Sequence, residues 1–187
     1  MHVAISGTHG SGKSTLLSDF TMSHRGWAML PDPFEYLDGA EQNPGASVFF
    51  QQLQIAADRL SEPMTKPVIA ERCPLDFLAY LHALDVLGRS GASAGLFERG
   101  YELTTQAMTN VDLLILLPLS GTDSIDIGAD EVLELRDAMN ESLLELVDEL
   151  DLAERRPVVE VTGNRAQRLA RLEGAIRDLG QGLTNLV

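Results

Sequence analysis

The chain has 187 residues, of which 44% are hydrophobic and 22% charged, so it can form one globular domain with a substantial core. Its net charge of −14 argues against a large nucleic-acid interface and against docking on an anionic membrane, because both need clustered Lys and Arg. The single cysteine, Cys73, excludes an intramolecular disulfide, and with no visible signal peptide or membrane-spanning stretch we expect a cytoplasmic protein.

Strand-like and helix-like segments alternate along the chain, which is typical of a parallel sheet covered by helices. The apolar patterns predict strands at 2–6, 27–30, 67–70, 113–117 and 158–161, and helices at 14–23, 47–60, 75–87, 94–108, 130–150 and 164–179. The strand at 113–117 is the most apolar and is expected at the centre of the sheet. We therefore expect a single α/β domain over 1–187, with three layers, about five parallel strands and a lid region at about 119–130.

A phosphate-binding pattern, G-x-x-x-x-G-K-[ST], lies between the first predicted strand and the first predicted helix. Its glycines, Gly7, Gly10 and Gly12, allow backbone torsions that are closed to other residues, so the loop can point its N–H groups at an anion. Lys13 supplies a charge for the β- and γ-phosphates, and the Ser14 hydroxyl is a hard oxygen ligand for Mg²⁺. The positive end of the following helix also faces the phosphates.

The motif thus predicts that the chain binds ATP together with Mg²⁺. The remaining candidate contacts of this loop are His9, Ser11 and Thr15. His9 occupies a variable position of the pattern, so it is given no separate role.

Charged residues follow the second and third predicted strands, where the carboxyl ends of parallel strands form a ligand crevice. Asp32 lies in a Pro-Asp-Pro sequence and could take a proton from an acceptor hydroxyl, or it could simply be a turn aspartate. Glu71 and Arg72 could hold magnesium and phosphate, or they could form a structural ion pair.

Taken in order, these motifs resemble those of the deoxynucleoside kinases and their P-loop kinase relatives. The resemblance covers roughly the first 80 residues: 7–15, Asp32-Pro33, Phe50-Gln51-Gln52 with Arg59 seven positions later, and Glu71-Arg72-Cys73 with Asp76. The stretch 71–80 is also similar to nicotinamide-riboside-kinase-like proteins, which leaves the substrate open.

The resemblance implies a role for each matching residue. Asp32 would be the general base, although the family usually has Glu there. Gln51 or Gln52 would read a nucleobase through its amide. Glu71 would bind magnesium, and Arg72 would contact phosphate and the acceptor hydroxyl. Phe34 and Asp76 complete the set of residues expected on the acceptor side.

The sequence departs from the family pattern in the second half of the chain. The family usually carries several arginines in the lid, but residues 119–128 contain none, and Arg136 on the next predicted helix is the only cation nearby.

The segment 162–165 is similar to the adenine-side loop of P-loop kinases, in which Arg165 would stack on the purine; Asn164 is equally a helix N-cap. Acidic residues are concentrated between 123 and 151, which is interpreted as a solvated helix face.

We therefore expect a Mg-dependent kinase that phosphorylates a hydroxyl of a nucleoside or a nucleoside-like small molecule. Two alternatives stay open: a nucleotide-binding ATPase or switch that engages a protein partner, and a kinase of a specialised metabolite or antibiotic alcohol. The expected partners are ATP and a small-molecule acceptor, without nucleic acid or membrane. The long helices would also allow a homodimer.

Overall fold

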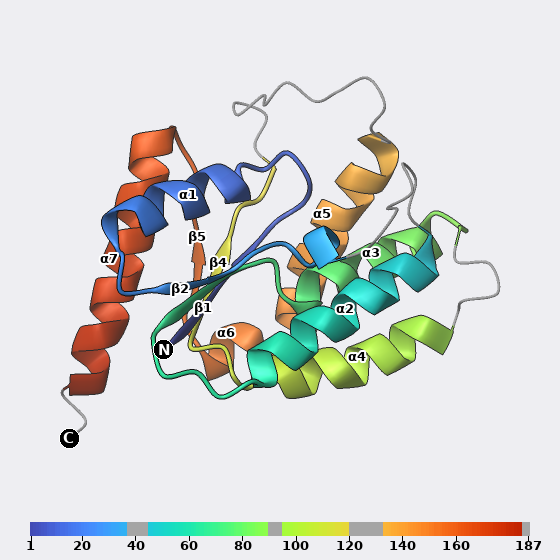
Figure 1. Ribbon diagram of the computed structural model, residues 1–187. Helices are drawn as coiled ribbons and strands as arrows, with labels where there is room; N and C mark the ends of the chain where they lie inside the picture. Colours follow the sequence, from blue (N-terminus) through green and yellow to red (C-terminus); the bar gives the residue numbers. More distant parts are fainter. Residues whose placement is uncertain (37–44, 90–94, 120–132, 185–187) are drawn as a thin grey trace.

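The centre of the molecule is a parallel sheet of five strands in the order β2-β3-β1-β4-β5 (Figure 1). The computed structural model describes residues 1–36, 45–89, 95–119 and 133–184 of the chain. The strands are β1 (His2–Ser6), β2 (Ala28–Leu30), β3 (Val68–Glu71), β4 (Leu113–Leu116) and β5 (Val158–Glu160). All five expected strands are present, each within one residue of its predicted bounds.

The helices are α1 (Lys13–Ser23), α2 (Ala46–Ser61), α3 (Pro74–Val86), α4 (Gly95–Met108), α5 (Leu133–Glu149), α6 (Leu152–Arg155) and α7 (Arg165–Thr184). A 3₁₀ turn, η1 (Pro33–Tyr36), and the short helix α6 were not predicted, and α7 continues five residues past its expected end. The predicted lid lies outside the described residues except for Leu119, and so does the predicted start of α5.

One expectation about the sheet was wrong in detail. β1, not β4, is the middle strand, and β4 lies directly beside it. Every residue of β4 is buried, as expected, because an interior strand of a parallel sheet is covered by helices on both faces whether or not it is the central one. The hydrophobicity of a strand therefore shows that it lies in the interior of the sheet, but it does not show which position the strand has in the strand order.

Alternating residues of the inner strands point to opposite faces of the sheet and belong to two separate hydrophobic cores. Val3, Ile5, Leu113 and Ile115 pack against α1 and α7 on one face, together with Phe20. The residues between them pack with α2, α3 and α5 on the other face, and they include the small side chains Ala4 and Ala70. Figure 1 shows the resulting three layers, with α1 and α7 on one side of the sheet and α2 to α5 on the other.

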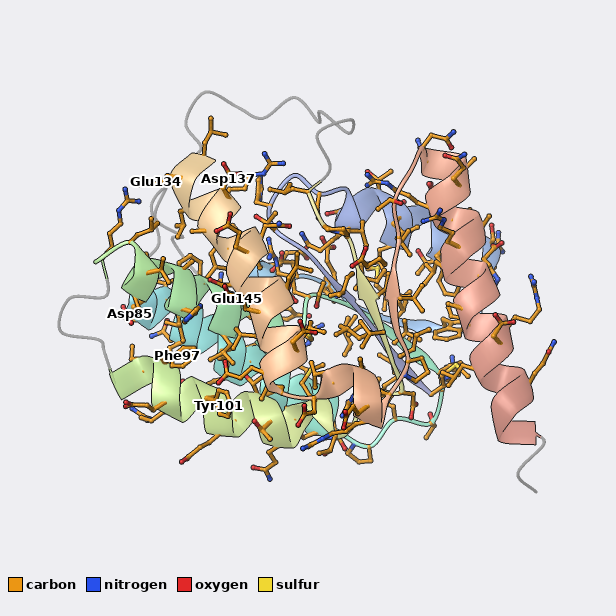
Figure 2. All side chains as sticks on the ribbon, turned by 180° about the vertical axis from the view of Figure 1, so that it is seen from behind. Asp85, Phe97, Tyr101, Glu134, Asp137 and Glu145 are labelled. Carbon is orange, nitrogen blue, oxygen red and sulfur yellow. The ribbon has the colours of Figure 1, made fainter. Side chains whose placement is uncertain are left out.

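Helix α5 is amphipathic in the way its sequence period predicts. Its buried residues, Leu135, Met139, Leu143 and Leu146, recur at spacings of three and four. The acidic side chains point away from the core, and Figure 2 shows Glu134, Asp137 and Glu145 on the outer surface. Among the described residues, no helix is long and apolar enough to cross a membrane.

The strand register brings the candidate site residues to one edge of the sheet. Ile5 pairs with Glu71, and Leu30 pairs with Ala70, so the segments that follow β1, β2 and β3 leave the sheet at the same level. These segments are the glycine-rich loop, the Asp32 turn and the turn that carries Arg72. The fold thus gathers residues that are distant in the sequence, such as Gly7 and Arg72, which are 65 positions apart.

Candidate active site

The loop after β1 is shaped for close backbone packing. Gly7 has φ +155°, and a Cβ there would lie 2.7 Å from the carbonyl oxygen of Leu117 and 2.8 Å from Ser11 Oγ. Gly10 and Gly12 have φ values of 68° and 93°, a region that side chains rarely adopt. Gly12 is the N-cap of α1, and no described side chain caps this end, so the first N–H groups of the helix can serve a bound anion.

Lys13 folds back over the same loop. Its Nζ donates to the Thr8 carbonyl at 2.6 Å and lies 3.4 Å from Ser11 Oγ. Burial, together with the positive charge of Arg72, lowers the pKa of Lys13 to about 7, although Asp76, Asp32 and Glu71 oppose the shift. The ammonium therefore lies in an environment that favours an added negative charge beside it.

Ser14 and Glu71 bring two hard oxygen atoms together. The Ser14 hydroxyl donates to Glu71 Oε1 at 2.5 Å, across the gap between α1 and the end of β3. Ser14 is exposed, whereas Glu71 is almost completely buried. Because Mg²⁺ prefers oxygen ligands and takes several of them from phosphates and water, this pair fits a magnesium site next to a triphosphate.

The turn between β3 and α3 holds Arg72 in an unusual backbone conformation. Arg72 has φ 65°, and its N–H donates to the Ile5 carbonyl at 3.0 Å. Cys73 then acts as the N-cap of α3, in a reciprocal capping box with Asp76. Cys73 thus takes a cap position that Ser, Thr, Asp or Asn more often occupies. Burial raises the pKa of its thiol, and the nearby Asp76 raises it further. A left-handed non-glycine residue is costly, so the hydrogen bond to Ile5 and the capping box that follows Arg72 both matter for keeping it in place.

The Arg72 side chain is aimed at Asp32. Its Nε donates to Asp32 Oδ2 at 2.7 Å, and its Nη1 donates to the Gly7 carbonyl at 3.3 Å. Burial disfavours the guanidinium charge, but Tyr80, Asp32 and Asp76 outweigh that effect and hold the pKa of Arg72 above its ordinary value. The other oxygen of Asp32 accepts the Phe34 N–H at 3.0 Å, as in an Asx turn, so the carboxylate is fixed from both sides.

The structure therefore brings together the P-loop, Asp32, Glu71 and Arg72. The turn interpretation of Asp32 is confirmed by its hydrogen bond to the Phe34 N–H. Arg72 does form ion pairs, but with Asp32 and Asp76 and not with the expected Glu71. The Asp32 side chain is 21% exposed, so this carboxylate can still meet a ligand.

The acceptor-side candidates lie at different depths. Gln52 is buried and follows Phe49 by three positions on the inner face of α2, whereas its neighbour Gln51 is exposed. Phe49 stacks on Tyr80 at 4.4 Å, and the Arg72 guanidinium lies 5.7 Å from the Tyr80 ring. Of the two glutamines, Gln52 therefore faces the side of the helix nearer to Arg72.

Two further candidates flank this region. Phe34 is 46% exposed at the start of the 3₁₀ turn, and Asp76 is fully buried beneath the P-loop. Arg59 of α2 contacts both sides of the Asp32 turn. Its Nη1 donates to the Pro31 carbonyl at 2.7 Å, and its guanidinium lies 4.9 Å from the Tyr36 ring. Direct contact of Phe34 or Asp76 with an acceptor remains a prediction.

Two arginines from helices in the second half of the chain also hold the P-loop. Arg168 of α7 donates to the Ser11 carbonyl at 2.6 Å and to the Gly163 carbonyl at 2.7 Å, which joins the adenine-side loop to the phosphate loop. Arg136 of α5 donates to the His9 carbonyl at 3.0 Å. Arg136 could be suspected from sequence because it is the only cation near the predicted lid. Ser6, whose hydroxyl donates to Asp76, matches no motif position.

Arg165, the predicted adenine contact, is 71% exposed and pairs with Asp19 of α1 through two hydrogen bonds, of 2.7 and 2.5 Å. Asn164 does precede the helix, and its Oδ1 accepts the Gln167 N–H at 3.1 Å. The cap interpretation of this segment is therefore confirmed, while stacking of Arg165 on a purine remains a prediction.

No protein-family model and no curated protein sequence matches the chain. Solved structures match it over nearly its full length. Deoxyadenosine kinase from M. mycoides with bound dATP has a TM-score of 0.72 at 17% identity, covering 95% of this chain and 100% of that one. Thymidylate kinase from Candida albicans has a TM-score of 0.66 at 16% identity, covering 95% and 91%.

The NadR protein in complex with NR has a TM-score of 0.66 at 14% identity and covers 93% of this chain and 51% of that one. Deoxyadenosine kinase and thymidylate kinase are kinases by name, as are the proteins that the sequence motifs resemble. The chain therefore has the α/β fold of the P-loop nucleoside and nucleotide kinases.

Proposed function

We propose that the chain is a Mg-dependent kinase that transfers the γ-phosphoryl group of ATP to a hydroxyl of a nucleoside or a nucleoside-like small molecule. The observation that carries this proposal is the Asp32–Arg72 pair, held within one hydrogen bond of the P-loop through the Gly7 carbonyl. An ATPase needs a phosphate-binding loop and an attacking water molecule. A carboxylate that a guanidinium holds in place beside this loop can take the proton of an alcohol acceptor, which favours a kinase.

Each residue has a defined task in this proposal. The P-loop N–H groups and Lys13 bind the phosphates. Ser14 and Glu71 would supply oxygen ligands to magnesium, which would screen the charge of the triphosphate. The acceptor oxygen forms a bond to the γ-phosphorus while the bond to the β-phosphate oxygen breaks and ADP leaves. Asp32 receives the hydroxyl proton, and Arg72 keeps Asp32 in position and faces the transferred group.

The acceptor would enter beside α2 and η1. The buried amide of Gln52 can exchange two hydrogen bonds with a planar heterocycle, and the exposed ring of Phe34 offers it a stacking surface. Arg136, at the end of α5 nearest the P-loop, is the described cation that could replace a lid arginine near the γ-phosphate. The resemblance to kinases of nucleosides and nucleotides supports this substrate class.

A screen for ADP release tests the proposal. Purified protein with Mg·ATP is assayed against nucleosides, nucleoside monophosphates, nicotinamide riboside and amino sugars. We expect stimulation by at least one ribosyl or deoxyribosyl compound. Lys13→Ala should abolish the activity, and Asp32→Asn should reduce kcat by about 10²- to 10⁴-fold.

Two outcomes would contradict the proposal. ATP turnover that no acceptor changes would identify an ATPase or switch instead. A wild-type rate in Asp32→Asn would remove this residue from the role of base. Asp58→Asn, an exposed aspartate of α2, is the matched control.

A further inference from the structure

The Asp76 carboxylate is fully buried in the first turn of α3, and the proposed reaction does not use it directly. Its Oδ1 accepts the Gly7 N–H at 2.9 Å. Its Oδ2 accepts the Ser6 hydroxyl at 2.7 Å and the Cys73 N–H at 2.9 Å. A buried carboxylate is stable only when hydrogen bonds and a nearby positive charge replace its solvation by water. The position of Asp76 therefore depends on these three donors.

Two of the three donors belong to the phosphate side of the site and one to the acceptor side. Ser6 ends β1 and Gly7 begins the P-loop, while Cys73 follows the strained Arg72. Arg72 Nη1 lies 3.7 Å from Asp76 Oδ1 and also donates to the Gly7 carbonyl at 3.3 Å. Gly7 is thus held through its N–H by Asp76 and through its C=O by Arg72.

We infer that Asp76 is a positioning residue: it holds the start of the P-loop in the geometry that receives phosphates and, from the other side, orients Arg72 toward Asp32. This inference rests on the proposed function, because it assigns Asp76 to the same site. It differs from the direct acceptor contact that the sequence resemblance implied, since all three hydrogen bonds of the carboxylate point into the protein.

Asparagine at this position would keep the shape but not the pattern of acceptors. Its amide has one oxygen, so its NH₂ group must face either the Gly7 N–H or the Cys73 N–H, and neither backbone donor can turn away. The Arg72 guanidinium would also lose a neighbouring negative charge. The first turn of the P-loop should therefore shift even if the domain folds normally.

Calorimetric binding of Mg·ADP, without any acceptor, tests the inference. We expect Asp76→Asn to weaken ADP binding by about 10- to 100-fold, the range typical of residues that orient a binding group. The milder Ser6→Ala removes one of three donors and should weaken ADP binding by about 2- to 10-fold. In the double variant, loss of the Ser6 hydroxyl should have less effect than it has alone, because its acceptor is already altered.

The binding stoichiometry separates positioning from folding. A merely structural role would lower the melting temperature or the fraction of binding-competent protein and leave the Kd of that fraction unchanged, which would overturn the inference. Asp85→Asn, an exposed aspartate at the other end of α3, is the matched control. Should Asp76→Asn fail to fold, Ser6→Ala decides: a wild-type Kd in that variant overturns the inference.

The proposed function fails in a different way. Absence of ADP binding by the wild-type protein would remove the nucleotide site altogether. Tight binding by the wild type, with equally tight binding by both variants, would leave the kinase proposal intact and reject only the role of Asp76.

Discussion

Ser14 and Glu71 lie 57 positions apart in the chain, yet the hydroxyl of one donates to the carboxylate of the other at 2.5 Å. The contact depends on the parallel pairing of β1 and β3, which places the end of β3 beside the loop that enters α1. It brings the two candidate magnesium ligands within hydrogen-bond distance of each other.

Glu71→Gln should raise the magnesium concentration needed for activity. Gln can still accept the Ser14 hydrogen bond but has no charge, so we expect a shift in the apparent magnesium requirement of about 10- to 100-fold. The measurement is initial rate against free Mg²⁺ at saturating ATP. Glu62→Gln, an exposed residue at the end of α2, should behave as wild type. An unchanged magnesium curve for Glu71→Gln would show that this carboxylate does not serve the metal.

Binding of Mg·ADP should take up a proton above neutral pH. The pKa of Lys13 is lowered to about 7, mainly by burial, so we expect the Lys13 side chain to be neutral in most molecules at pH 8. Adjacent phosphates favour the ammonium form and raise this pKa again, so the complex should bind about one proton more than the separate species at pH 8, and fewer at pH 6. Calorimetry in buffers of different ionisation enthalpy measures this number. Proton release at pH 8 would contradict the assignment.

Gln52→Ala should impair use of the acceptor more than Gln51→Ala. The buried amide of Gln52 lies on the inner face of α2, and an acceptor that bonds to it would lose about 1–3 kcal/mol on its removal. The kcat/KM for the acceptor should fall by about one to two orders of magnitude, with little change in the KM for ATP. The adjacent, exposed Gln51 supplies a control on the same helix turn. Equal effects of the two substitutions would place base recognition elsewhere.

Arg136→Ala should lower kcat if this side chain replaces the missing lid arginines. Arginines that neutralise a transferred phosphoryl group contribute up to about 10³- to 10⁵-fold in rate, and Arg136, which is only partly buried, should contribute less than that. Arg177→Ala, an exposed position on α7, controls for the loss of one positive charge. A kcat within twofold of wild type would leave Lys13 and Arg72 as the cations of the reaction.

The architecture could be predicted from sequence because its signals are local. Apolar periods located all five strands to within one residue, and the glycine-rich loop identified the edge of the sheet at which the site lies. The short helix α6 escaped prediction because four residues are too few to show a period. The 3₁₀ turn at Pro33 is the continuation of the Asx turn of Asp32, and its hydrogen bonds are not visible in an apolar pattern.

The candidate site could be predicted only in part, because several of its contacts depend on tertiary structure. The juxtaposition of Asp32 and Arg72 depends on the pairing of β2 with β3, whereas the sequence predicted only that both residues follow strands at the carboxyl edge of the sheet. The roles of Ser6 and Arg168 do not follow from any motif, since each contacts its partner only once the sheet and helices have packed. Asp76 matched a motif position, but its burial beneath the P-loop depends on the close approach of α3 to β1.

The close fit of Gly7 against the Leu117 carbonyl limits how this nucleotide cradle could be re-engineered. The shape of the loop depends on its packing against the residue that follows β4 as well as on its own glycines. Residues 7–14 grafted alone onto another scaffold would lack this contact, so a transplant would also have to include the end of β4.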